Sequence, residues 1–162
     1  MAFVIDGTIG SQKAATTSAT QLHELGKISP MFDSTYNVGE YIYLLGVAST
    51  AVGSIVLYNE DDFSTSLLAA NDIGQVAVAM SANVASQYGW YQIGGKAVGK
   101  VLTGFADDAN CYATATGGSI DDAVVSGDRV KRMKGASAIG TPSSGLAELE
   151  IQRPFMDDAV AA

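Results

Sequence analysis

From Glu40 onward the chain consists of short apolar runs separated by glycine, asparagine or aspartate. The runs recur roughly every eight to twelve residues, the spacing typical of antiparallel barrels and sandwiches. Residues 61–72 are the one stretch that could form a helical turn or two, with a loop as the alternative. The pattern predicts an all-β fold, a compact antiparallel β-barrel or sandwich with at most one short helix. The runs are YIYLLGVA, SIVLYNE, QVAVAMSA, YGWYQIGG, KVLTGF, CYATAT, DRVKRMK and AELEIQR.

The first part of the chain has a different pattern. SQKAATTSATQ is polar and has no period, and it precedes LHELGKISPMF and the turn-forming DSTYNVG. Such a segment rarely forms a core of its own. We therefore predict an extended N-terminal arm over residues 1–38, with a short strand around His23 to Ile28, and a barrel-like body over residues 39–162.

Residues 41–58 are uncharged over about the minimum length of a membrane span. Their centre, GVASTAVG, is small and bounded by glycine, and the flanking charges are Glu40 and Glu60 rather than basic residues. Two buried strands joined by a turn fit this composition better. The N-terminal MAFVIDGTIG also lacks the pattern of a secretory leader. We expect no membrane partner.

The net charge of −8 argues against direct nucleic-acid binding, because such binding depends on clustered basic residues. Four of the nine basic residues nevertheless lie together, in GDRVKRMKG. One interpretation is a strand with Val130 and Met133 facing inward and its cations in solvent. The other is a docking patch for an acidic partner surface. The four basic residues are Arg129, Lys131, Arg132 and Lys134.

No pattern of catalytic or metal-binding residues stands out. The chain has one histidine, His23, and one cysteine, Cys111. We therefore expect neither a catalytic triad with a histidine base nor a zinc site built from histidine and cysteine. Paired aspartates at 61/62, 107/108, 121/122 and 157/158 lie beside turn residues, where aspartate usually bonds to its own backbone. The glycines match no nucleotide-binding loop. We expect no enzyme activity, no catalytic residue, no metal and no cofactor, and a buried Cys111.

The aromatic run around the single tryptophan is therefore the most informative feature. Tyr88, Trp90 and Tyr91 lie in SQYGWYQIGGKAVG, and such side chains suit a surface that a partner covers. The alternative is that alternation along a strand points some of them into the core. Core packing is the stronger reading for Trp90, and the interface is the stronger reading for the two tyrosines.

The order of these signals over residues 20–156 resembles the capsid cement, or head decoration, proteins of tailed bacteriophages. YGWYQIGG is especially similar to small virion proteins of marine and cyanobacterial phages. The remaining matching phrases are HELGKI, EYIYLLGVASTAVGSIVLY, GQVAVAMSANVASQYGWYQIGGKA, GGSIDDAVVSGDRVKRMKGA and ELEIQRPF.

This resemblance implies a β-tulip or jelly-roll-like virion protein, made in the host cytoplasm, on the outer surface of the expanded capsid. It would clamp adjacent subunits of the major capsid protein as a homo-oligomer, with a trimer favoured and a dimer possible. Its arm would add contacts, so deletion of residues 1–28 is expected to abolish shell binding and leave the body folded. Alternatives are a carbohydrate-binding β-module for host-surface adhesion, a minor head or fibre-base protein, and a small hydrolase. The expected interface residues are Phe3, Val4, Ile5, Leu22, Leu25, Ile28, Tyr88, Trp90 and Tyr91.

Overall fold

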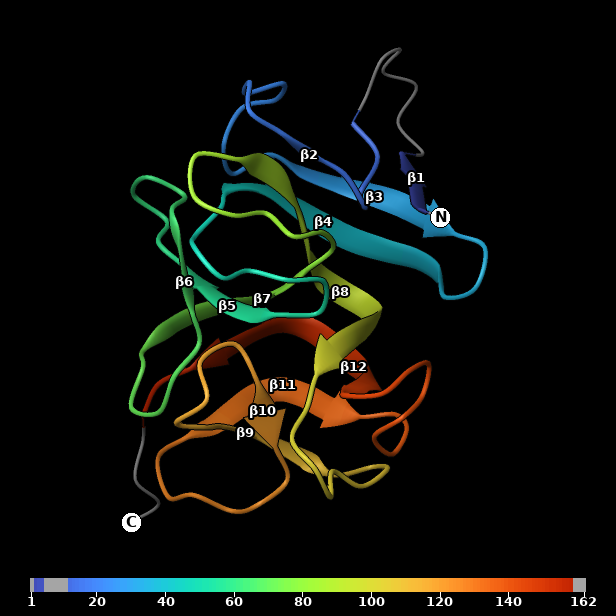
Figure 1. The fold of residues 1–162 in the computed structure, drawn as a ribbon, viewed down its shortest axis with the longest axis vertical. Coiled ribbons are helices and arrows are strands. Elements are labelled where there is room, and N and C mark those ends of the chain that lie inside the picture. The colour runs from blue at the N-terminus through green and yellow to red at the C-terminus, as the bar shows by residue number, and fades with distance from the viewer. Residues whose placement is uncertain (1, 5–11, 159–162) are drawn as a thin grey trace.

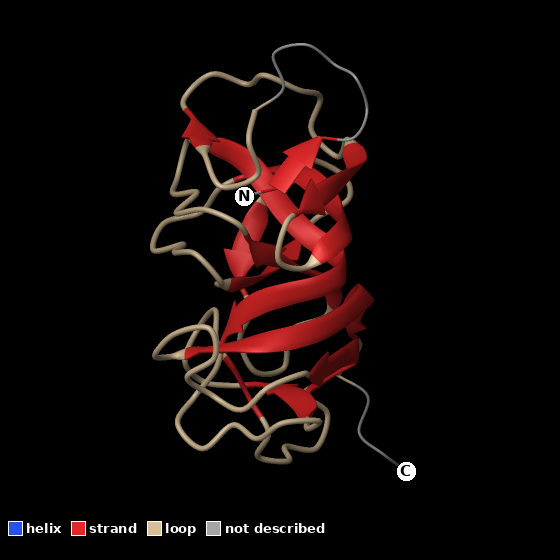
Figure 2. Cartoon of the chain, turned by 90° about the vertical axis from the view of Figure 1, so that its right-hand side faces the viewer, coloured by secondary structure: helices blue, strands red, loops and turns tan. Residues whose placement is uncertain are grey.

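Twelve strands make up the regular structure of the residues that are described. The computed structural model describes residues 2–4 and 12–158, and within these ranges it contains no helix (Figures 1 and 2). The predicted all-β class is confirmed. The strands are β1 (Ala2–Val4), β2 (Thr17–Ser18), β3 (Ile28–Asp33), β4 (Asn37–Leu45), β5 (Ile55–Tyr58), β6 (Thr65–Leu67), β7 (Gly74–Ala79), β8 (Tyr88–Lys100), β9 (Asn110–Ala113), β10 (Ile120–Asp121), β11 (Arg129–Gly135) and β12 (Leu146–Met156).

The strands belong to one sheet whose ladders are antiparallel. The main path runs β1-β3-β4-β8-β7-β12-β11-β9-β10, with β2 joined to β8 and β5 joined to β6 and β7. Its two ends, β1 and β10, do not pair with each other, so the sheet is not closed into a barrel. Of the two predicted forms, a compact sandwich-like fold fits. Among the described residues there is also no apolar helix of membrane-spanning length.

The long strand β8 connects the two halves of the molecule, drawn one above the other in Figure 1. Its first part pairs with β4, from Tyr88 to Gly94, whereas its second part, from Gly94 to Lys100, pairs with β12. The change of partner occurs at Gly94 and Gly95. Gly95 has a φ of 93°, and a Cβ there would lie 3.0 Å from the carbonyl oxygen of Val38, so glycine is required for this bend.

The pattern of apolar runs predicted most of these strands. Residues 41–58 form parts of β4 and β5 with a connection between them, as expected, and Cys111 is buried on β9. One local prediction was wrong, because KVLTGF is the end of β8 followed by a turn rather than a separate strand. Of the two alternatives for residues 61–72, the structure has the loop, interrupted by the short strand β6.

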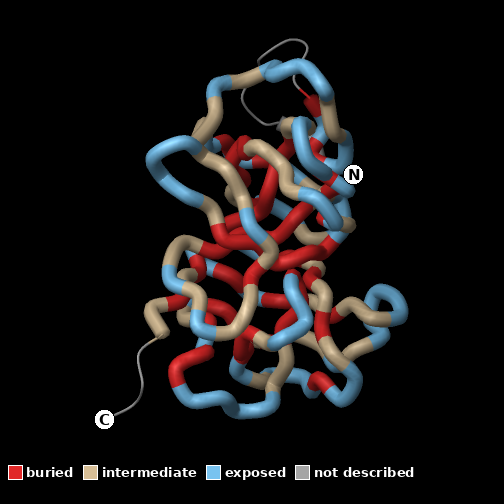
Figure 3. The backbone as a smooth tube through the Cα atoms, turned by 60° about the vertical axis from the view of Figure 1, so that its left-hand side comes forward, coloured by how far each residue is buried: buried red, intermediate tan, exposed pale blue. Residues whose placement is uncertain are grey.

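Buried side chains form three clusters along the long axis, and Figure 3 shows the buried segments running through the middle of both halves. The cluster at the β9–β12 end includes Cys111 and Leu149, and the middle cluster includes Ile42 and Tyr91. The third cluster lies on the other face of β3, β4 and β8, around Trp90. Another segment must pack on this face to keep Trp90 out of water, because burial of its large apolar ring stabilises the folded state.

Residues 12–26, which we call the strap, provide that cover. Gln12 is buried, accepts a hydrogen bond from the Tyr43 hydroxyl at 2.8 Å and donates one to the carbonyl oxygen of Tyr88 at 3.1 Å. The ring of His23 packs against the rings of Tyr43 and Trp90, with centroids 5.1 and 5.2 Å away. Burial lowers the pKa of His23, which favours the neutral ring in this contact.

The strap and the strands that follow it are continuous with the rest of the sheet. The strand predicted around His23 to Ile28 instead begins at Ile28 and runs to Asp33, and the residues before it form a turn. The predicted division between residues 38 and 39 falls inside β4, which pairs with β3 along its first six residues. Residues 12–38 therefore contribute directly to a buried cluster and to the sheet.

This arrangement changes the expected result of a truncation. Deleting residues 1–26 removes the cover of Trp90, so we expect the free energy of unfolding to fall by several kcal/mol, the order that loss of packing around a buried tryptophan costs. The emission of Trp90 should shift to longer wavelength. Leu22→Ala, a change at an exposed strap residue, is the control and should leave the emission unchanged. A truncated chain as stable as the full chain, with unchanged emission, would contradict the assigned role of the strap.

Candidate functional site

Two of the expected interface residues are core residues, which confirms the stronger reading for Trp90 and contradicts it for Tyr91. Trp90 is 1% exposed and Tyr91 is fully buried. The Tyr91 hydroxyl accepts a hydrogen bond from Asn83 Nδ2 at 3.1 Å, while Trp90 packs beneath the strap. Neither side chain has surface to offer a partner, so their assignment to an interface is corrected. The cause is strand alternation, with the strap covering one face of β8 and the middle cluster covering the other.

The other predicted interface residues have different positions. Leu25 and Tyr88 are partly buried against the cluster around Trp90. Leu22 and Ile28 are exposed, at 52% and 42%. Phe3 and Val4 lie on β1, which pairs with β3, but their side chains, like the whole of Ile5, lie outside the described part of the chain. Only Leu22 and Ile28 are thus seen as accessible apolar side chains.

Ile28 belongs to an apolar surface on the β3–β4 hairpin. Alternation along β3 places Ile28, Pro30 and Phe32 on one face, and all three are exposed. Phe32 lies directly opposite Val38 on β4, and these side chains are 44% and 56% exposed. We call these four residues the hairpin patch. Contiguous exposed apolar side chains of this kind mark interaction sites more often than scattered ones do.

A groove begins at Ile28 and continues across the molecule. Its first hollow has a volume of about 420 Å³ and lies between β3, β4, the β5–β6 turn, β8 and the end of β12. Its lining is mixed, because Tyr58, Glu60, Gln75, Arg132 and Arg153 accompany the apolar side chains. Two further hollows share Arg132 with the first and extend toward Lys134, so we treat the three as one central groove. The apolar walls are Ile28, Ile42, Phe63, Ile93 and Phe155.

Phe63 is held over the groove by the loop between β5 and β6. Its backbone has a φ of 56°, and its ring occupies the space where a Cβ on Gly26 would lie, 2.2 Å from the nearest ring carbon. Gly26 itself has a φ of 78°. A side chain at that position would displace Phe63, so this glycine fixes one wall of the groove.

Arg132 lies at a break in the pairing of β11 and β12. One residue of β11, Arg132, faces three residues of β12 between the Lys131–Phe155 and Met133–Ile151 pairs. The extra residues change the alternation, which lets both Val130 and Met133 point into the core even though they are three positions apart. The sequence-based expectation that both face inward is confirmed, through a bulge instead of a regular strand.

Arginines occupy strained backbone positions on both sides of this bulge. Arg132 has a φ of 60° and Arg153 has a φ of 45°. The left-handed region costs a residue with a Cβ roughly 1–2 kcal/mol. The bulge requires that conformation but does not require arginine, because glycine or asparagine adopts it more easily. Strained residues of this kind occur preferentially at functional sites.

The two guanidinium groups differ in their partners. Arg153 donates to both carboxylate oxygens of Glu40, at 2.7 and 2.9 Å, and these bonds hold the pKa of Glu40 below its ordinary value. Arg132 is exposed and lies 5.9 Å from the centre of the Phe155 ring. Among residues 12–158, no carboxylate forms an ion pair with Arg132. Arg132 is therefore a cation of the first hollow without an ion pair among these residues, although the carboxylate of Glu60 also lines that hollow.

The rest of the basic cluster is more fully engaged. Lys131 pairs with Asp157, and Lys134 pairs with Asp108 at 2.7 Å. Arg129 donates to the neutral Asn110 side chain at 2.8 Å. The two arginines on β11 are thus the cations of this cluster without a carboxylate partner in the described residues.

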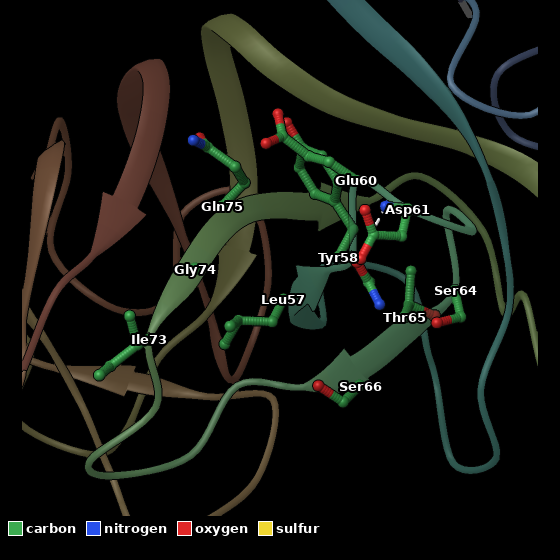
Figure 4. Close-up of a pocket in the computed structure, with 11 residues that line it drawn as sticks. Leu57, Tyr58, Glu60, Asp61, Ser64, Thr65, Ser66, Ile73, Gly74 and Gln75 are labelled. Carbon is green, nitrogen blue, oxygen red and sulfur yellow. Dashed lines mark hydrogen bonds between the residues drawn. The ribbon is translucent and has the colours of Figure 1, made fainter.

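A polar pocket adjoins the first hollow and shares Tyr58, Glu60 and Gln75 with it. Figure 4 shows Glu60 and Gln75 at one side of it and Ile73 at another, with Ser66 on the neighbouring strand β6. Nearby carboxylates serve the local turns, since Asp62 accepts hydrogen bonds from Ser64 at 3.0 and 2.7 Å. Among the described residues, no group of three or more histidine, cysteine or acidic side chains is placed to hold a metal ion.

The two residues with the most reactive side-chain chemistry are both packed into clusters. Burial raises the pKa of Cys111 to about 12, so its thiol is protonated at neutral pH. His23 packs against Trp90 with its Nε2 atom buried. The chain's most distinctive exposed features are therefore the hairpin patch and the central groove, which are suited to binding another surface.

Sequence reasoning missed Phe32, Val38, Arg153 and Glu40. The alternation in ISPMFD was a usable signal for Phe32, because it places Ile28, Pro30 and Phe32 on one face of a strand. The Glu40–Arg153 pair joins residues 113 positions apart and had no local signal. Comparison with known proteins does not identify the site either, since no family model, curated protein or solved structure matches the chain.

Paired substitutions can test the backbone strain at Arg132. Arg132→Gly and Arg132→Ala both remove the guanidinium and differ only in the Cβ. We expect the glycine variant to be more stable by about 1 kcal/mol, because glycine avoids the strain of the left-handed conformation. At Lys134, whose backbone is regular, we expect alanine to be more stable than glycine by roughly 0.5–1 kcal/mol. Denaturant titration measures both differences in the free energy of unfolding. If the alanine variant were the more stable one at both positions, strain at Arg132 would be excluded.

Proposed function

We propose that this chain is a structural virion protein that binds the outside of a tailed-phage head and clamps adjacent major capsid protein subunits. The observation that carries the proposal is the exposed hairpin patch, which is continuous through Ile28 with the central groove. The resemblance of the sequence to capsid cement proteins supplies the identity of the partner. In this role the chain stabilises the expanded shell by burying apolar area between subunits.

In this proposal the hairpin patch forms the contact with the capsid, in place of the aromatic residues Trp90 and Tyr91, which are buried. Phe32 and Val38 form a directly opposed pair on one face of β3 and β4, so one partner surface can cover both. Each copy would add a modest contact, and many copies on a lattice would together resist expansion of the shell. A homo-oligomer, with a trimer favoured and a dimer as the alternative, would strengthen each clamp because its binding sites are tethered.

A carbohydrate-binding module is less well supported. Stacking against a sugar ring needs an exposed aromatic face, and Trp90 and Tyr91 are both buried. Among the side chains that the structure describes, Phe32 is the aromatic one that is well exposed, and its neighbours in the patch are apolar. No observation favours this function over surface binding.

Co-sedimentation with expanded, decoration-free capsids tests the proposal. The full chain should bind and raise the melting temperature of the shell. The double variant Phe32→Ser/Val38→Ser should bind at least about 100-fold more weakly, because each side chain contributes roughly 1.5 kcal/mol or more when buried. Val124→Ser/Val125→Ser, which changes exposed valines on the β10–β11 loop, is the control and should bind normally.

Two outcomes would contradict this assignment. Absence of wild-type binding to any such capsid would reject the proposed function. Equal binding by the two double variants would reject the hairpin patch as the contact surface. Emission from Trp90 shows whether each variant is folded, because that side chain lies on the opposite face of the hairpin from the patch.

A further inference from the structure

We propose that the central groove binds an extended segment of a partner protein, with a carboxylate of that segment on Arg132 and an apolar side chain in the adjoining hollow. The inference deepens the proposed function, on which it rests for the statement that the partner is a neighbouring protein chain. It adds the chemistry of the contact, namely an acidic and apolar sequence.

The first argument is charge. The chain carries a net charge of −8, and its described ion pairs give carboxylate partners to Lys96, Lys131, Lys134 and Arg153. Arg132 and Arg129 line the same hollow and have no carboxylate partner among the described residues. A guanidinium binds a carboxylate through two parallel hydrogen bonds, as Arg153 does with Glu40 beside the groove. Beside the groove, Arg153 thus has its carboxylate, Glu40, whereas Arg132 has no carboxylate partner among the described residues.

The second argument is the strained backbone. Arg132 is kept at a position where glycine would be easier to accommodate, and the bulge would bury Met133 with either residue. Strain of this kind is found preferentially at functional sites, and the contact of Arg132 with the Phe155 ring, at 5.9 Å, leaves the guanidinium without an ion pair among the described residues. A bound anion would use the guanidinium itself.

The third argument is the spacing of the two chemistries. Arg132 is itself part of the wall of the hollow formed by Ile28, Phe63 and Phe155. In an extended segment, side chains two positions apart point to the same side. A partner segment with an aspartate or glutamate two residues from a large apolar side chain therefore matches both parts of the groove.

Phosphate groups and nucleic acid fit these features less well. Their affinity depends on several clustered cations, and Lys131 and Lys134 are already paired with aspartates of this chain. A phosphate would also leave the apolar side chains of the first hollow uncovered, and Glu60 in its lining would repel it. A second copy of this chain remains a distinct occupant that the experiment separates.

The test is a titration of the full-length protein with acetyl-Thr-Asp-Thr-Phe-Thr-Asp-Thr-amide, followed by NMR of the arginine Nε–H groups. The peptide places an aspartate two residues from phenylalanine in either chain direction. We expect the Arg132 signal to shift, with a dissociation constant in the millimolar range. The peptide with both aspartates replaced by asparagine should bind at least about tenfold more weakly, because a charge-assisted bond is lost.

Protein variants provide the matched comparison. Arg132→Gln should weaken binding of the aspartate peptide by at least about tenfold, whereas Lys100→Gln, an equal charge change away from the groove, should change it less than about twofold. Phe63→Ser should also weaken it, which tests the apolar hollow. Trp90 emission confirms that each variant is folded.

Four outcomes would overturn the inference. They are no binding up to the solubility limit, equal binding of the asparagine peptide, a shift of Arg132 by inorganic phosphate at lower concentration than by the peptide, and a shift of Arg132 on dilution of the protein alone. The last would assign the groove to a second copy. None of them depends on capsids, so a failure here is distinct from a failure of the proposed function.

Discussion

The structure depends on one strand, β8, being shared by two halves of a sheet. Its first half pairs with β4 over a buried aromatic face, and its second half pairs with β12 over the cluster that contains Cys111. The bend at Gly94 and Gly95 turns the strand from one half to the other without interrupting the chain. Because both clusters are built on the same backbone, disturbance of one half should be felt by the other.

This shared strand also explains where the binding features lie. The groove lies beside the bend, because its second hollow is lined by Gly94 and Gly95 together with residues of β4, β11 and β12. The hairpin patch is held at the rim because β4 is anchored along β8. A rigid arrangement of this kind lowers the entropy that binding costs, which favours a protein that acts through contact surfaces.

The sequence was sufficient to predict the class of fold but not the placement of its surfaces. Turn residues between short apolar runs report local structure, and they correctly predicted β4, β5, β7, β8 and β12. Whether Trp90 faces a partner or the core depends on the strap, a segment some 65 to 80 positions earlier whose polar composition gave no indication of that contact. The basic run on β11 was visible, but only the folded chain distinguishes Lys131, which pairs with Asp157, from Arg132, which has no ion pair within residues 12–158.

The most direct test of this account compares unfolding of the two halves. The single tryptophan reports the cluster beneath the strap, and the single cysteine reports the cluster at the other end. Cys111 is buried and protonated, so a thiol reagent should not reach it until its own half opens. We expect Trp90 emission and Cys111 labelling to change at the same denaturant concentration, as one cooperative unit requires. Two separate midpoints would mean that β8 does not couple the halves and that the groove between them is not a fixed surface.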